Sequence, residues 1–206
     1  MSHRRKPLAA AFFLNTAVLV VEIAGGLKAS SLSLLLDGVH NLSDELALGL
    51  LVLAYTLRTG LSGRLLRFAN LFNSLGLVAV CMFLMWQALE RLAQPVSVIG
   101  LIPVVAGLAG ALGNWGVARV LREPAREDAA IRLAYVHNLG DVLLSLAPVA
   151  AGILVLVSGQ SLFDPGVASI VAAVILVTTI RSVVGSHREL MWPEKVACAH
   201  PEPGPN

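Results

Sequence analysis

Charged residues are scarce in this sequence. Of its 206 residues only 14% are charged, whereas 56% are hydrophobic and the mean hydropathy is +0.78. Soluble domains carry about 25% charged residues. A chain of this length cannot bury so much apolar surface and still present a polar exterior, so an ordinary soluble domain is excluded. We therefore expect lipid to be the solvent for most of the surface.

Cysteine and aromatic residues are also few. The two cysteines, Cys81 and Cys198, cannot make a disulfide framework and lack the spacing of a metal site. Aromatic residues make up 5% of the chain, so its hydrophobic character comes from leucine, valine, alanine and isoleucine. The formal net charge of +2 is too small to favour a nucleic-acid partner.

The apolar residues form runs of about 20 residues, the length that crosses about 30 Å of hydrocarbon as a helix. These runs do not alternate with polar residues, which excludes the strands of a membrane barrel. We therefore predict an all-α fold: an integral membrane bundle of six transmembrane helices in one domain over residues 1–190, with a short disordered tail over residues 191–206. The predicted helices are residues 8–27, 34–57, 68–89, 101–118, 131–157 and 167–184.

Basic residues indicate the orientation of these helices. Of the 15 lysines and arginines, 13 lie at one set of helix ends: before the first helix, between the second and third, from the end of the fourth to the start of the fifth, and from the end of the sixth onward. The positive-inside rule then predicts that both termini are cytoplasmic, with the chain in the inner or plasma membrane. Arg4, Arg5 and Lys6 could instead begin a signal peptide, but Glu22 interrupts the apolar run that follows.

Polar side chains inside the predicted helices are the best indication of function. A charged side chain at the bilayer centre costs about 2.5–3.5 kcal/mol on insertion scales, so such residues need a reason to be there. The second and fifth predicted helices hold most of them. The residues, in chain order, are Asn15, Glu22, Asp37, His40, Asn41, Asp44, Glu45, Asn114, His137, Asn138 and Asp141.

Two of these helices carry the same polar string. His40 and Asp44 are four residues apart and so share one face of the second helix, and His137 and Asp141 repeat that spacing on the fifth. The six-residue strings around the two pairs agree at five of their six positions. Such a repeat in otherwise apolar helices indicates a common role for the two pairs.

Two histidines and two carboxylates form the donor set of a tetrahedral site for a borderline divalent cation. Zinc accepts imidazole nitrogen and carboxylate oxygen, and four such ligands complete its shell. Magnesium and calcium prefer oxygen ligands alone. The alternative is a packing role, because interhelical polar contacts in membranes are worth about 0.6 kcal/mol each. The repetition favours metal, so His40, Asp44, His137 and Asp141 are predicted to form one tetrahedral metal site.

The other polar residues are less specific. Asp37 lies near the same face as His40 and is equally compatible with an access path or contact to a ligand and with a simple helix-end carboxylate. Glu22 and Asn15 form one stripe of the first helix, which favours packing contacts or a pathway over ligation. Glu45 and Asn114 are predicted to be structural.

The sequence resembles the cation diffusion facilitator family of zinc and heavy-metal transporters over about residues 8–194. The resemblance rests on residues 22–26 (EIAGG), 31–44 (SLSLLLDGVHNLSD), 137–141 (HNLGD) and 163–165 (FDP). The paired histidine–aspartate strings are specific to the family, whereas the glycine pair and the Asp-Pro pair alone would be weak signals.

The resemblance implies a six-helix bundle with cytoplasmic termini, usually a homodimer, that exports metal by proton-coupled alternating access. It also implies that the two histidine–aspartate pairs supply the transport-site ligands, and histidine at the first position is typical of the zinc-preferring branch. The sequence departs from the family in two ways. A cytoplasmic ferredoxin-like domain usually follows the sixth helix, where only residues 187–206 remain here, and residues 119–132 contain none of the family's loop histidines.

We therefore predict a secondary transporter that moves a divalent transition metal, zinc foremost, out of the cytoplasm in exchange for protons. Its expected partners are the metal ion, protons, the lipid bilayer and a second copy of the chain joined through membrane helices. An enzyme is not expected, because the sequence has no glycine-rich phosphate loop. Two alternatives stay open: a membrane scaffold or channel-like protein with a structural metal site, and the same fold carrying cobalt, cadmium, manganese or iron.

Overall fold

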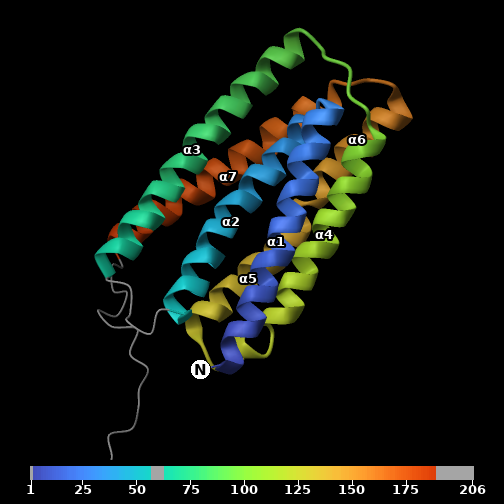
Figure 1. Cartoon of the computed structure of the whole chain (residues 1–206). Helices are drawn as coiled ribbons and strands as arrows, with labels where there is room; N and C mark the ends of the chain where they lie inside the picture. The colour runs from blue at the N-terminus through green and yellow to red at the C-terminus, as the bar shows by residue number, and fades with distance from the viewer. Residues whose placement is uncertain (1, 57–62, 189–206) are drawn as a thin grey trace, which may run out of the picture.

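The computed structural model describes residues 2–56 and 63–188, so the predicted tail over residues 191–206 lies outside it. The described chain is helical and contains no strand, which confirms the predicted all-α class (Figure 1). Its elements are α1 (Ser2–Ala29), α2 (Leu32–Thr56), α3 (Gly63–Ala93), α4 (Leu101–Leu121), the 3₁₀ helix η1 (Pro124–Arg126), α5 (Ala129–Leu144), α6 (Leu146–Ser158) and α7 (Phe163–Arg188).

Five segments are long and apolar enough to cross a membrane, and they correspond to five of the six predicted spans. They are Lys6–Ala29, Leu71–Ala93, Leu101–Leu121, Ile131–Ser158 and Phe163–Arg181. Helix α2 has 25 residues but carries three acidic side chains and His40, which lower its hydropathy. It runs alongside α1 through the bundle (Figure 1), so it is the sixth membrane helix, made more polar by these side chains.

The fifth span differs from the prediction. The apolar run over residues 131–157 predicts one continuous helix, but α5 ends at Leu144 and α6 begins at Leu146. Pro148 explains the break, because a proline ring clashes with the carbonyl four residues earlier, here that of Leu144. The break leaves the side chain of Ser145 fully buried between the two helices. Most other helices exceed their predicted ranges, because polar residues continue them beyond their apolar centres.

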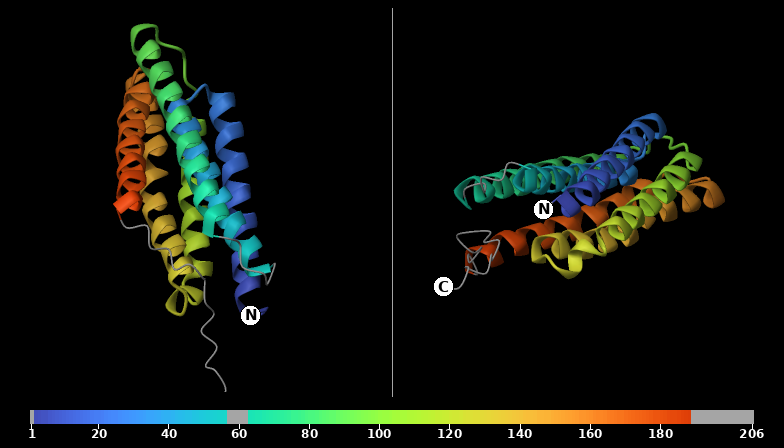
Figure 2. Two further views of the ribbon diagram at one scale, coloured as in Figure 1. Left: turned by 90° about the vertical axis from the view of Figure 1, so that its left-hand side faces the viewer. Right: turned by 60° about the horizontal axis from the view of Figure 1, so that its bottom comes forward.

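The helices pack in two groups, one built around α1 and α4 and the other consisting of α3 and α7. Helix α1 packs between α2 and α4, and α4 packs in turn against α5 and α6. Helix α3 lies at the edge of the bundle and packs mainly against α7 (Figure 2). The start of α1, the connection between α4 and α5 and the end of α7 lie at one end of the bundle (Figure 1). The chain therefore makes an even number of passes between its two ends.

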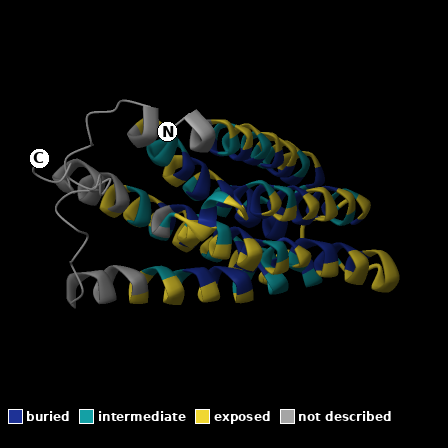
Figure 3. Cartoon of the chain, turned by 90° about the horizontal axis from the view of Figure 1, so that it is seen from below, coloured by how far each residue is buried: buried dark blue, intermediate teal, exposed yellow. Residues whose placement is uncertain are grey.

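The outside of the bundle is apolar. Buried parts of the helices face one another and exposed parts face outward (Figure 3). Phe13, Phe72 and Trp86 are 70%, 69% and 71% exposed, although aromatic side chains of this size dominate the cores of soluble proteins. This surface suits contact with lipid tails, as the composition predicts.

Helix α2 begins at a carboxylate that another helix supplies. Asp164 is fully buried near the start of α7 and accepts hydrogen bonds from the Leu32 backbone N–H and from the hydroxyls of Ser31 and Ser33, each at 2.6 Å. The Ser31 hydroxyl in turn accepts a hydrogen bond from the Leu34 N–H at 3.2 Å, which makes Ser31 the N-cap of α2. A negative charge at a helix N-terminus is favoured by the helix dipole. Asp164 therefore fixes the end of α2 against α7.

We expect Asp164→Ala to destabilise the protein by about 2 kcal/mol or more, because it leaves buried donors without an acceptor. The measurement is thermal unfolding of the purified protein in detergent. Ser169→Ala is the matched control, since the Ser169 hydroxyl donates to the Pro165 carbonyl of its own helix. Equal stability of the two variants would show that the buried carboxylate contributes nothing to holding α2.

Candidate metal centre

Two side chains of α2 and two of α5 converge inside the bundle. One ligand atom from each of His40, Asp44, His137 and Asp141 lies within 4.8 Å of the others. Among the residues that the structure describes, this is the one group of three or more histidine, cysteine or acidic side chains arranged in this way. The structure therefore brings together the four residues that the repeated string singles out.

Each histidine lies closer to the carboxylate of the other helix than to that of its own. His40 Nε2 is 3.1 Å from Asp141 Oδ1, and His137 Nε2 is 2.7 Å from Asp44 Oδ1. The two same-helix pairs, four residues apart, are separated by 3.8 Å each. Ligand atoms about 2.0–2.1 Å from a tetrahedral zinc ion would lie about 3.3 Å apart, within the span of these distances. The four side chains thus enclose a position of the right size for such an ion.

Burial is uneven around this position. The side chains of Asp44 and Asp141 are 7% and 6% exposed and that of His40 is 12% exposed, whereas that of His137 is 48% exposed. Buried oxygens of both aspartates, the Oδ2 atoms, have no hydrogen-bond partner. Buried carboxylate oxygens without partners are costly unless a cation or water satisfies them. The donor set is therefore suited to a divalent cation.

Polar contacts hold α2 against α1 beside this position. Asn15 Nδ2 donates to the Asn41 carbonyl at 3.1 Å and to Glu45 Oε2 at 2.9 Å. The Thr16 hydroxyl donates to the other oxygen of Glu45. Glu45 therefore has donors for both of its oxygens from α1, in line with the structural role predicted for it.

Two contacts have no counterpart in the sequence predictions. Asn114 Nδ2 of α4 donates to the hydroxyl of Ser145 at 3.2 Å, so the break between α5 and α6 presents a polar group to α4. Asn73 Nδ2 of α3 donates to the carbonyl and the hydroxyl of Ser43 at 3.2 and 2.8 Å. Pro148 is the sequence signal for the first contact, because it predicts a break nearby. Asn73 itself, a polar residue within an apolar run, is the signal for the second.

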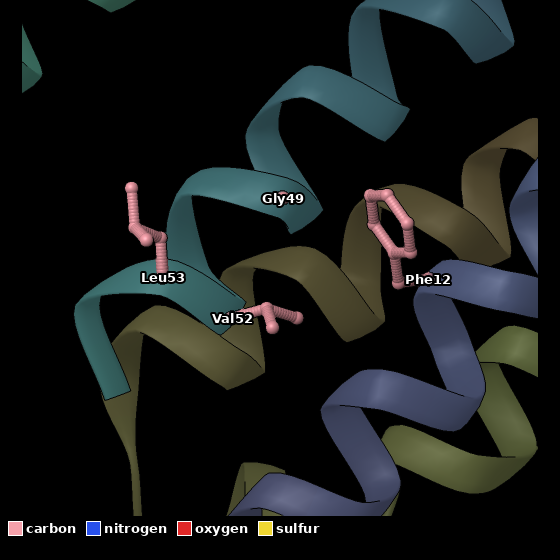
Figure 4. Close-up of a pocket in the computed structure, with 4 residues that line it drawn as sticks. All are labelled: Phe12, Gly49, Val52 and Leu53. Atoms are coloured by element: carbon pink, nitrogen blue, oxygen red, sulfur yellow. The ribbon is translucent and has the colours of Figure 1, made fainter. Parts of the chain in front are cut away.

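A hollow of about 230 Å³ lies elsewhere, between α1 and α2 (Figure 4). Phe12, Gly49, Val52 and Leu53 line it. These residues offer no side-chain oxygen, nitrogen or sulfur, so the hollow is separate in chemistry from the histidine–aspartate group.

Several known proteins are similar to this chain. It is 31% identical over 184 residues to "Zinc transporter ZitB" of Pectobacterium atrosepticum, which covers 85% of this chain and 58% of that protein. It is 30% identical over 190 residues to "Zinc transporter ZitB" of Escherichia coli, covering 88% and 61%. It is 28% identical over 182 residues to the "Cadmium, cobalt and zinc/H(+)-K(+) antiporter" of Bacillus subtilis, covering 84% and 58%. The chain thus spans about three fifths of the length of these curated relatives.

A family model covers nearly the whole described bundle. The model for the cation efflux transmembrane domain matches residues 8–191, a range that includes α2 and α5 with all four converging side chains. The match agrees with the helical membrane bundle and with the relatives. This chain belongs to the cation efflux family.

Proposed function

We propose that the chain carries a divalent transition metal, zinc foremost, out of the cytoplasm, and that His40, Asp44, His137 and Asp141 are its ligands during transport. The observation that carries this proposal is the convergence of the four ligand atoms within 4.8 Å of one another. Two carboxylates balance the two charges of the ion, so the loaded site is neutral overall. A neutral site is far less costly at membrane depth than an isolated charge.

Protons are the proposed counter-ion. Metal binding requires neutral imidazole and ionised carboxylate, so loading expels protons from the site and protonation expels metal. Histidine exchanges protons near neutral pH, since its unperturbed pKa is about 6.5. The Bacillus subtilis relative is named an antiporter of metal against H⁺ and K⁺, which supports exchange of cations by this chain as well.

The name of that relative also favours a wider set of transported metals, because it includes cadmium and cobalt beside zinc. Nitrogen and oxygen ligands bind several divalent metals in order of intrinsic affinity, so the donor set alone does not select zinc. The decisive experiment measures uptake of zinc, cadmium, cobalt, manganese and iron into proteoliposomes at two pH gradients. Tight zinc binding without flux of any ion would instead establish a structural metal site.

We propose a cytoplasmic location for both termini, in the inner or plasma membrane. Cysteine substitutions next to Arg64 and Arg126, in a chain without native cysteines, should react only with reagents that reach the cytoplasm. Substitutions at Ser97 and Gln160 should react from outside. The structure supports placing Ser97 and Gln160 on the same side. The Val98 N–H donates to the Ser161 hydroxyl at 3.1 Å, which joins the two connections that contain these residues. If the position beside Arg64 and the position beside Arg126 reacted from opposite sides of the membrane, the prediction of six membrane passes would be contradicted.

We also propose that residues 1–190 act as one transporter domain and that two copies associate through their membrane helices. Native mass spectrometry of the protein released from lipid nanodiscs measures the number of copies directly. A single copy that still transports zinc would contradict the dimer.

A further inference from the structure

Besides Glu45 and Asp164, two further acidic side chains are buried inside the bundle outside the metal centre. Glu22 of α1 is fully buried and Asp37 of α2 is 1% exposed. Glu22 Oε1 and both oxygens of Asp37 have no well-formed hydrogen bond. An ionised carboxylate without partners is among the most costly groups to bury. Two ionised carboxylates at this place would therefore be costly without a proton or another cation.

The packing of the helices places Glu22 against α2 and α4. Its Oε2 atom accepts a hydrogen bond from Asn41 Nδ2 of α2 at 2.6 Å. A methyl group added at Gly38, next to Asp37, would lie 3.3 Å from the Glu22 Cβ atom. One added at Gly110 of α4 would overlap Glu22 Oε1. The bare backbone of Gly110 therefore makes room for the oxygen that has no partner.

Asp37 completes the group from the side of α2. It lies beside Glu22 and beside Ser145, the residue at the break between α5 and α6. The charged groups that act on the pair are few. They are His40 and Asp44 of α2 and Asp141 of α5, whereas Asn114 of α4 and Ser145 contribute neutral groups.

Without a cation nearby, two neighbouring carboxylates away from water do not both stay ionised, because like charges at close range disfavour a second ionisation. Sharing one proton removes most of that cost, as in other paired carboxylates. We propose that Glu22 and Asp37 form a proton-binding site, separate from the metal ligands, that takes up and releases one proton in each transport cycle. This inference rests on the proposed function as a metal–proton exchanger.

Asn41 connects this site to the metal centre. It follows His40 directly in α2 and donates its amide to Glu22. A dication at the metal centre favours the ionised form of nearby carboxylates, so metal loading from the cytoplasm releases the shared proton to the cytoplasm. When the metal leaves on the opposite side, the pair takes a proton from that side. The pair thus adds one proton to those displaced from the ligands themselves.

The test measures protons moved per zinc ion in proteoliposomes, with a pH dye and a zinc dye in the same vesicles. We expect Glu22→Gln to bind zinc within about threefold of the unmodified protein but to move about one proton fewer per zinc. Glu45→Gln is the matched control. It replaces another buried glutamate of the bundle whose oxygens already have donors, and its proton count should be unchanged.

A second measurement does not depend on transport. Infrared spectra of the zinc-free protein at neutral pH should show a protonated-carboxyl band that decreases when zinc is added and is missing in Glu22→Gln and Asp37→Asn. An unchanged proton count in Glu22→Gln, or an unchanged carboxyl band, would overturn this inference alone. Zinc flux without any proton movement in the unmodified protein would overturn the proposed function instead.

Discussion

Replacing Asp141 with alanine should weaken zinc binding by more than about 100-fold. Loss of a group that merely orients a metal ligand typically costs 10–100-fold in affinity, so loss of a ligand should cost more. The Asp141 Oδ1 atom also faces His40, so its removal changes the surroundings of a second ligand. Isothermal titration calorimetry with zinc on the detergent-purified protein measures the effect.

Asn138→Ala is the appropriate control for this experiment. Asn138 lies three residues before Asp141 and is also buried, but its amide donates to the Ala134 carbonyl of the same helix. Its replacement should leave zinc affinity within a few-fold. Unchanged zinc affinity in Asp141→Ala would show that the four side chains converge without serving as the ligands.

Acidification should release zinc from the site. Below about pH 6.5, each imidazole that binds a proton stops being a ligand, so apparent affinity should fall by up to about tenfold per pH unit for each histidine. The sign follows from the ligand chemistry, since low pH favours the protonated forms and high pH favours the metal complex. An acidic exterior should therefore drive zinc out of the cytoplasm.

Proteoliposomes allow this pH effect to be measured. Zinc flux should increase when the compartment that receives zinc is made acidic, and the pH of that compartment should rise as zinc enters. The flux of His137→Ala should be strongly reduced, because one ligand is missing, and the flux that remains should depend less on the gradient, because one titrating group is missing as well. Zinc movement with no opposing proton movement would indicate a passive uniporter.

Local sequence pattern was sufficient to predict which four side chains of α2 and α5 lie together. His40 with Asp44 and His137 with Asp141 follow from helical spacing and from the repeat, and the structure brings all four together. The crossed arrangement, with each histidine nearer the other helix's aspartate, depends on how α2 and α5 are turned relative to one another. Spacing within one helix carries no information on that rotation.

Other features of the fold depend on long-range packing in the same way. Pro148 lies in the sequence as a known helix breaker, but the unbroken apolar run around it predicted one span. Asp164 appears in the sequence as part of a turn before the last helix. Its hydrogen bonds to Ser31 and Ser33 join residues more than 130 positions apart, and only the assembled bundle reveals them.

The crossed contacts between the two histidine–aspartate pairs also affect the mechanics of the bundle. Helix α2 packs chiefly against α1, and α5 against α4, rather than against each other. A cation held by His40, Asp44, His137 and Asp141 would link the α1–α2 pair to the α4–α5 pair for as long as it stays bound. Without the cation, the two pairs contact each other mainly through α1 and α4. The cargo itself would then set how far the two pairs can separate, and each release would free the bundle to change shape.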